Sequence, residues 1–390
     1  MEDISFFTEK EKAELFALYK RLIRSAGESI TKDDTRKLKK YLIHAAQCNS
    51  LRRNNFGMNP VIRDLQTAVV VADEIGMKGS CLIGIMLHEI VKNNVLSPAT
   101  VRSEFGEDVS SIITGLVKTN ELYAKSPAIE SENFRNLLLS FAEDMRVILI
   151  MIADRVNVMR QIKDSENEED RIKVANEAAY LYAPLAHKLG LYKLKSELED
   201  LSLKYIHRDT YYFIKDKLNE TKASRDKYIA AFIEPIQKKV KEAGLKFDIK
   251  GRTKSIHSIW NKIQKQKTPF EGIYDLFAIR IILDSDPDKE KQECWQAYSI
   301  VTDMYQPNPK RLRDWLSIPK SNGYESLHIT VMGPEGKWVE VQIRYKTVWV
   351  ISPVGVPIPT QVPYEYRIFH TKLVNRGLEV VIREELDNDQ

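Results

Sequence analysis

The stretch that decides the fold runs from Lys250 to Asp284 and reads KGRTKSIHSIWNKIQKQKTPFEGIYDLFAIRIILD. Its first half has the spacing of a helix that buries one face, and the residues on that face are Ile256, Ile259, Trp260 and Ile263. Pro269 and Gly272 interrupt this pattern, and the apolar run 276–283 then predicts a buried strand. A helix followed by a buried strand favours a domain that combines helices with a sheet.

Polar side chains recur every four residues in the helical part, at Lys254, Ser258 and Lys262. Residues four apart share one helix face, so we expect two ammonium groups and a hydroxyl in line. A cationic face at a helix start is suited to polyphosphate. Asp275 lies at the entrance of the predicted strand and Arg280 lies inside it, where a charge is costly unless it is paired or used.

A second polar stretch runs from Arg311 to His328, and the segment 339–344 after it reads VEVQIR. In this segment Glu340, Gln342 and Arg344 share one face of a predicted strand, whereas apolar residues fill the other face. A carboxylate on a rigid strand is well placed to ligate a metal or to act as a base. The alternative is an ordinary solvated outer face.

Five motifs follow one another in this half of the chain: GRTK, the helix with Lys254, IYDLFAIR, PKSNGYESLH and VEVQIR. In this order they resemble the synthetase domain of the long RelA/SpoT homologues, and a looser resemblance to the N-terminal catalytic half of that family covers roughly residues 15 to 345. These enzymes make (p)ppGpp in the stringent response by moving the pyrophosphoryl group of ATP to the 3′-hydroxyl of GDP or GTP. The resemblance implies a nucleotidyltransferase-like mixed sheet.

The resemblance also implies Mg²⁺ as cofactor and ATP with GDP or GTP as substrates. It makes Asp275 and Glu340 the Mg²⁺ ligands, Glu340 the base and Gln342 its support. The residues that it assigns to ATP are Arg252, Lys254, Ser258, Lys262 and Arg280. The residues that it assigns to GDP or GTP are Arg313, Lys320, Asn322, Tyr324 and His328. The choice between the two acceptors stays open.

The first 195 residues have an all-helical pattern, which resembles the HD hydrolase domain of the same family. That domain holds a metal with an early His, an adjacent His-Asp pair and a distant Asp. Here these positions carry Asp64, the pair His88-Glu89, and Asp154, while Lys92-Asn93 replace an acidic pair. We therefore expect a degenerate hydrolase site without hydrolase chemistry, in a domain that regulates the synthetase.

The expected fold class is α+β, with an all-helical HD-like domain followed by the synthetase domain. The expected segments are a pseudo-HD domain (1–195), a helical connector (196–240), the synthetase domain (241–346) and a divergent Pro-containing tail (347–390). In the third segment, strands at 245–249, 276–283, 326–332 and 338–343 alternate with helices around 255–267 and 290–304. This alternation predicts a sheet that helices cover on one face.

The composition is that of an ordinary soluble protein, with 43% hydrophobic and 29% charged residues among 390. The three cysteines lie far apart, without metal or disulfide spacing, which indicates a reducing cytoplasmic setting. No apolar run reaches about 18 residues, so we expect no membrane span. The net charge of +4 is too small to indicate a nucleic-acid binder.

Other interpretations remain open. A (p)ppGpp hydrolase would need the His/His-Asp/Asp set that this chain largely lacks. A non-catalytic ribosome- or RNA-binding scaffold could use Lys310, Arg311 and Arg313 against phosphates, but it would have no need of both Asp275 and Glu340. The family resemblance also leaves open regulation by (p)ppGpp, and contact with the ribosome or tRNA through regions outside this chain.

Overall fold

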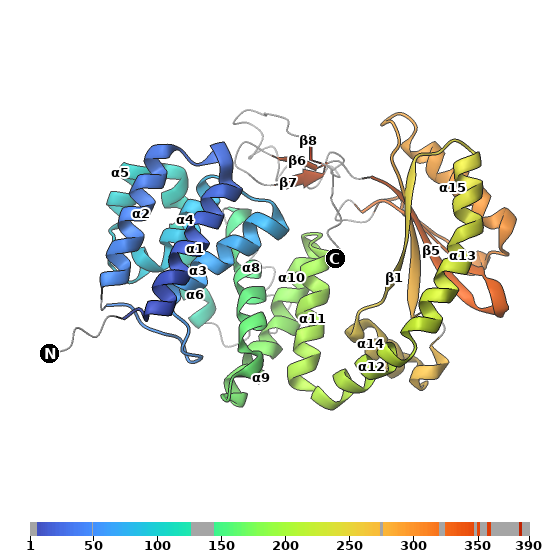
Figure 1. The fold of residues 1–390 in the computed structure, drawn as a ribbon, viewed down its shortest axis with the longest axis horizontal. Helices are drawn as coiled ribbons and strands as arrows, with labels where there is room; N and C mark the ends of the chain where they lie inside the picture. Colours follow the sequence, from blue (N-terminus) through green and yellow to red (C-terminus); the bar gives the residue numbers. More distant parts are fainter. Residues whose placement is uncertain are drawn as a thin grey trace. The chain divides into compact units, whose positions relative to one another are not determined.

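The computed structural model describes residues 6–48, 50–125, 144–273, 276–319, 324–346, 349–351, 357–359 and 382–383. The main body of the chain divides into two compact units, and the division falls between Ile206 and His207. The first unit is helical, and the second combines helices with a sheet (Figure 1). The expected order, a helical domain followed by an α+β domain, is therefore confirmed.

The helical unit is built around α4, whose residues 81–91 are all buried. A helix that is apolar on every side belongs inside a bundle. The helices of this unit are α1 Glu9–Ala26, α2 Lys32–Gln47, α3 Pro60–Val70, α4 Ser80–Lys92, α5 Pro98–Phe105, α6 Glu107–Lys125, α8 Met145–Gln161, α9 Glu168–Glu177, α10 Ala183–Lys188 and α11 Tyr192–Ile206.

Local capping fixes where several of these helices begin. The hydroxyls of Thr31 and Ser97 accept backbone N–H groups at the starts of α2 and α5, and the Asn59 side chain does the same for α3. A π-helical turn, Val71–Ile75, extends α3 and ends at Gly76, whose φ of 85° lies in the left-handed region that glycine favours. The sequence alone predicts these boundaries, because Thr31 and the Asn59-Pro60 pair are typical of helix starts and Gly76 of a helix end.

The second unit contains a sheet to which β1 and β5 belong (Figure 1). Its five strands have the order β1-β2-β5-β4-β3. β2 and β5 run parallel, and the other neighbouring strands run antiparallel. Its elements are α12 Arg208–Glu220, α13 Lys222–Glu242, β1 Phe247–Thr253, α14 Ile256–Gln266, β2 Phe277–Leu283, α15 Glu290–Met304, β3 Arg313–Asp314, β4 Leu327–Met332 and β5 Trp338–Tyr345. Short strands β6 Trp349–Ile351, β7 Pro357–Pro359 and β8 Ile382–Arg383 follow.

The two faces of the five-stranded sheet differ in chemistry. Apolar residues of β2, β4 and β5 alternate with polar ones, and they form one core with the buried residues of α13 and α15. The buried helix residues of this core are Tyr228, Phe232, Ile236 and Val240 of α13, with Cys294, Ala297 and Val301 of α15. Because the helices take the apolar side, the polar side chains of the strands gather on the opposite face.

Helix α13 packs closely on β1 at Gly251. A Cβ atom added at this glycine would lie 2.7 Å from Cγ2 of Ile229, which is closer than side chains tolerate. The two units divide after Ile206 because Leu198 and Tyr205 of α11 belong to the core of the helical unit, whereas α13 contributes to the core under the sheet. Within the part of the chain that is described, no helix combines the length and the apolar character needed to cross a membrane.

Candidate active site

Strand register lines up four of the predicted site residues across the polar face of the sheet. Arg280 on β2 pairs with Gln342 on β5, Gln342 pairs with His328 on β4, and His328 pairs with Arg313 on β3. Paired residues on neighbouring strands point to the same side of a sheet. These four side chains therefore belong to one row, although Arg280 and Gln342 are 62 positions apart in the sequence.

Glu340 lies on β5 two residues before Gln342, on the same face of the strand. Three polar side chains contact its carboxylate. Its Oε2 accepts a hydrogen bond from Nζ of Lys254 at 3.0 Å, and its Oε1 accepts one from Nε2 of Gln342 at 2.8 Å. Nδ1 of His328 lies 3.5 Å from the same Oε1. The prediction that Glu340 and Gln342 share one strand face is confirmed.

These contacts keep Glu340 ionised. Burial by itself would raise the pKa of this carboxyl group. The hydrogen bonds from His328 and Gln342 and the charge of Lys254 outweigh the burial, so the pKa of Glu340 lies well below its ordinary value. A half-buried carboxylate of this kind offers the hard oxygen donors that Mg²⁺ prefers, so the side chain fits the ion that the sequence resemblance implies.

Two aromatic residues contact His328, which lies next to Glu340. Nε2 of His328 lies 2.9 Å from the hydroxyl of Tyr324, and the Trp315 ring meets the imidazole edge-on with centroids 4.5 Å apart. From the sequence alone we would expect a tryptophan at 315 to belong to the core, but Trp315 is only half-buried and touches the site. The tryptophan in RDWL gives no local signal of this, because the contact depends on the pairing of β3 with β4.

The predicted ATP residues are distributed differently from the expected single helix face. Helix α14 begins at Ile256 and is capped by Ser255, so Lys254 precedes the helix, and Arg252 lies on β1. Ser258 and Lys262 are on the helix, where the hydroxyl of Ser258 accepts a hydrogen bond from that of Ser255. The expectation that Lys254 lies in line with them on one helix face is therefore wrong.

Three of the predicted site residues, Asp275, Lys320 and Asn322, lie outside the described residues. Their assignments to Mg²⁺ and to the acceptor nucleotide stay predictions. Most of the predicted tail after residue 346 also lies outside the described residues.

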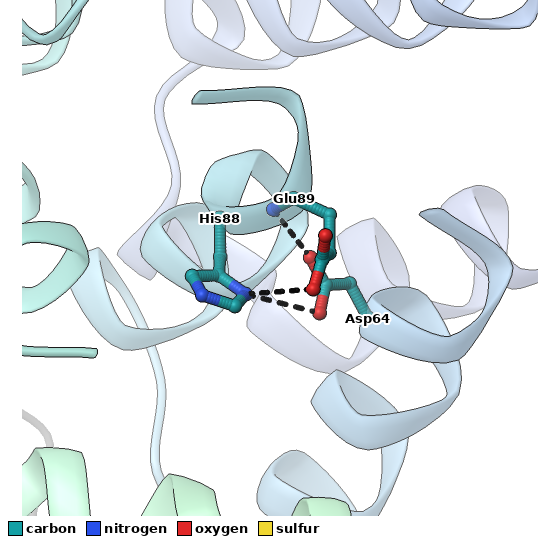
Figure 2. Close-up of side chains that lie close together, drawn as sticks. All are labelled: Asp64, His88 and Glu89. Carbon is teal, nitrogen blue, oxygen red and sulfur yellow. Dashed lines mark hydrogen bonds and ion pairs between the residues drawn. The ribbon is translucent and has the colours of Figure 1, made fainter. Parts of the chain in front are cut away.

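The helical unit contains a second polar cluster, which is buried. Asp64 on α3 and His88 and Glu89 on α4 place their ligand-type atoms within 4.8 Å of one another (Figure 2). Nδ1 of His88 lies 3.4 Å from Oδ1 of Asp64, and the backbone N–H of Glu89 donates to Oδ2 of Asp64 at 2.8 Å. The other ring nitrogen of His88 points away from both carboxylates (Figure 2). Three of the four residues of the predicted degenerate site thus come together from two helices.

Side-chain cations contact the acidic groups of this cluster. The guanidinium of Arg63 donates two hydrogen bonds to Asp154 on α8, and the ammonium of Lys92 donates to Oε1 of Glu89 at 2.8 Å. Burial would raise the pKa of both acids, but Arg63 holds the pKa of Asp154 below its usual value. His88 and Lys92 do the same for the pKa of Glu89. Of the four residues that the resemblance assigns to the hydrolase site, Asp64, His88 and Glu89 contact one another, and Asp154 pairs with Arg63.

Family comparisons match the two units separately. A model described as a region found in RelA and SpoT proteins matches residues 251–358, and a model of the HD domain matches residues 42–192. The chain belongs to the RelA/SpoT family. The suspected resemblance is thereby confirmed, and the polar sheet face and the buried cluster lie within its two characteristic regions.

Named relatives of this RelA/SpoT chain include both synthetases and hydrolases. A GTP pyrophosphokinase of Myxococcus xanthus is 33% identical over 82% of this chain and 42% of its own length. A guanosine-3′,5′-bis(diphosphate) 3′-pyrophosphohydrolase of Aquifex aeolicus is 34% identical over 73% and 40%, respectively. The bifunctional (p)ppGpp synthase/hydrolase SpoT of Escherichia coli is 29% identical over 87% and 47%. This chain spans less than half the length of these relatives.

Proposed function

We propose that this RelA/SpoT chain is a (p)ppGpp synthetase that transfers the pyrophosphoryl group of ATP to the 3′-hydroxyl of GDP or GTP. The observation that supports it best is the convergence of Lys254, His328 and Gln342 on the ionised Glu340, on the polar face of the sheet. Phosphoryl-type transfer asks a protein for positioning and charge neutralisation more than for covalent chemistry. A cationic face with one half-buried carboxylate meets that need.

In the proposed reaction the 3′-oxygen of the acceptor bonds to the β-phosphorus of ATP. The bond from that phosphorus to the α-phosphate oxygen breaks, and AMP leaves with the electron pair. Glu340 accepts the proton of the 3′-hydroxyl, while Lys254 and Arg252 hold the donor nucleotide and Tyr324 and His328 the acceptor. Bound Mg²⁺, held by Glu340 and in our proposal by Asp275, would neutralise phosphate charge.

We further propose that the helical unit lacks hydrolase activity and regulates the synthetase. Lys92 replaces an acidic group at a place where a carboxylate would position water, and Arg63 already engages Asp154. A large folded unit without chemistry of its own is best explained as a regulator. The proposal predicts that removing residues 1–195 changes the activity of the synthetase or its response to nucleotides.

Hydrolysis of (p)ppGpp is the second candidate function, and one observation favours it. Asp64, His88 and Glu89 are close enough to surround a divalent ion. Incubating the protein with labelled ppGpp and Mn²⁺ tests it directly, because release of pyrophosphate would establish hydrolysis. The synthetase proposal is tested by incubating labelled ATP with GDP or with GTP and Mg²⁺, with and without ribosomes carrying deacylated tRNA. A guanosine 3′-diphosphate product supports it.

A further inference from the structure

Two side-chain cations lie beside the acidic groups of the helical unit that the resemblance assigns to a metal site. Arg63, next to Asp64 on α3, reaches across to Asp154 on α8 with a two-pronged contact. Lys92 lies one turn after Glu89 on α4, and Asn93 donates a further hydrogen bond to Oε2 of Glu89 at 3.0 Å. Each of the two pairs joins a carboxylate to a fixed cation.

The donor set of this cluster therefore fits a divalent metal poorly. Buried carboxylates attract a metal because their charge is otherwise uncompensated. Here the guanidinium of Arg63 offsets the charge of Asp154, and the ammonium of Lys92 offsets the charge of Glu89. Asp64 contacts His88 directly and accepts the Glu89 backbone N–H group. A divalent ion would have to displace Lys92 from Glu89 and would bring two positive charges beside Arg63, which like-charge repulsion opposes.

We propose that Arg63 and Lys92 are built-in counter-ions, and that the cluster on α3, α4 and α8 is an ion-pair centre that holds the helical unit together without a metal. The side chain of Lys92 is 45% exposed and that of Glu89 10%, so the pair is partly buried. Removing the cation of such a pair leaves the charge of the buried carboxylate uncompensated and lowers the stability of the fold. The cations thus give the unit the stability that a bound metal would otherwise supply. This inference rests on the proposed absence of hydrolysis, but it concerns stability and metal binding and not turnover.

Binding of Mn²⁺ to the full chain tests this inference, measured by electron paramagnetic resonance or calorimetry. The measurement is made with Glu340→Gln as background, so that the carboxylate of the sheet unit does not contribute. We expect no Mn²⁺ bound at 100 µM in that background, and about one equivalent when Lys92→Met is added. Lys195→Met is the matched control, because Lys195 also pairs with a glutamate of its own helix, Glu199, at 2.8 Å. This control should bind no Mn²⁺.

Thermal unfolding provides the second readout. Lys92→Met should lower the melting temperature by about 2–6 °C, and Mn²⁺ should restore part of that loss. The inference would be overturned if the Glu340→Gln protein bound one equivalent of Mn²⁺ with Lys92 intact and lost it when His88→Asn is added. An unchanged melting temperature in Lys92→Met without gain of Mn²⁺ would also overturn it. Neither outcome bears on the proposed function. That proposal fails if the protein hydrolyses labelled ppGpp, or if it makes no guanosine 3′-diphosphate product.

Discussion

Nζ of Lys254 lies 3.0 Å from Oε2 of Glu340, so the residue proposed to hold the phosphates of ATP is paired with the residue proposed to hold Mg²⁺. In the proposed complex the phosphates of ATP pair with the ammonium of Lys254, and Mg²⁺ binds the carboxylate of Glu340. Binding of both would therefore exchange one internal ion pair for two contacts with the substrate complex. The pair keeps both groups charged and ordered until then.

Lys254→Met should lower kcat/KM for ATP by about 10²–10³-fold, because it removes a charged group aimed at the reacting phosphates. Lys254→Arg keeps the charge and should retain part of the activity. Lys289→Met is the matched control, since Lys289 is a half-exposed lysine with an acidic partner, Asp286, at 3.5 Å. Equal losses in Lys254→Met and Lys289→Met would exclude a specific role of Lys254.

Trp315 is expected to position His328. Trp315→Ala should lower kcat/KM by about 10- to 100-fold, because a small misplacement of a site residue has effects of this size. Trp315→Phe keeps an aromatic edge against the imidazole and should stay within a few-fold of the unchanged protein. Steady-state kinetics with both nucleotides, with circular dichroism to verify folding, measures the effect. Full activity in Trp315→Ala would show that the aromatic contact is dispensable.

Acid stability should depend on Glu11 in the helical unit. Hydrogen bonds from Arg53, opposed by burial, lower the pKa of Glu11 from its ordinary 4.5 to about 2. Since the folded pKa lies below the unfolded one, the stabilisation is complete above pH 4.5 and is lost as the pH falls toward 2. Glu11→Gln should lower the melting temperature at pH 7, and the difference should shrink between pH 4.5 and pH 3.

The control for this pH dependence is Glu9→Gln. Glu9 is highly exposed and pairs with Lys12 on the surface of α1. Exposed pairs of this kind contribute little to stability. A melting-temperature difference for Glu11→Gln that stays constant from pH 7 to pH 3 would contradict the role of the Arg53 contact.

Gly251→Ala should destabilise the sheet unit by about 1–3 kcal/mol, because the added methyl group would overlap Ile229 where α13 crosses β1. Denaturant unfolding measures this loss. The double variant Gly251→Ala/Ile229→Ala should lose little more stability than Ile229→Ala alone, because the overlap is then absent. A double variant whose loss equals the sum of the two single losses would show that the cost of Gly251→Ala does not come from the overlap with Ile229.

Much of the sheet unit was predictable because its signals are local. A continuous apolar run predicted β2, and the strand predicted at 326–332 corresponds to β4, each to within one residue of its observed start. Alternation of apolar and polar residues assigned Glu340 and Gln342 to one face of β5. Similar local signals gave the caps of α2 and α3. These patterns lie within a few residues of one another, so no knowledge of tertiary contacts was required.

Some features of the two sites could not be predicted from the sequence, because they depend on the tertiary structure. Arg63 and Asp154 are 91 residues apart, and only the packing of α3 against α8 brings them together. Lys254 appeared helical because its spacing to Ser258 fits a helix, but the Ser255 cap starts α14 after it. Trp315 appeared to be a core residue because an aromatic side chain carries no sign of which neighbour it will meet.

The most direct test of the proposed function compares three proteins in one assay with labelled ATP, Mg²⁺ and either GDP or GTP. The proteins are the unchanged chain, Glu340→Gln, and Glu335→Gln, a control that changes an exposed glutamate paired with Lys337. The account predicts a guanosine 3′-diphosphate product from the unchanged chain and from Glu335→Gln, and a loss of at least about 10³-fold in Glu340→Gln. Product formation by Glu340→Gln at the rate of the unchanged chain would contradict it.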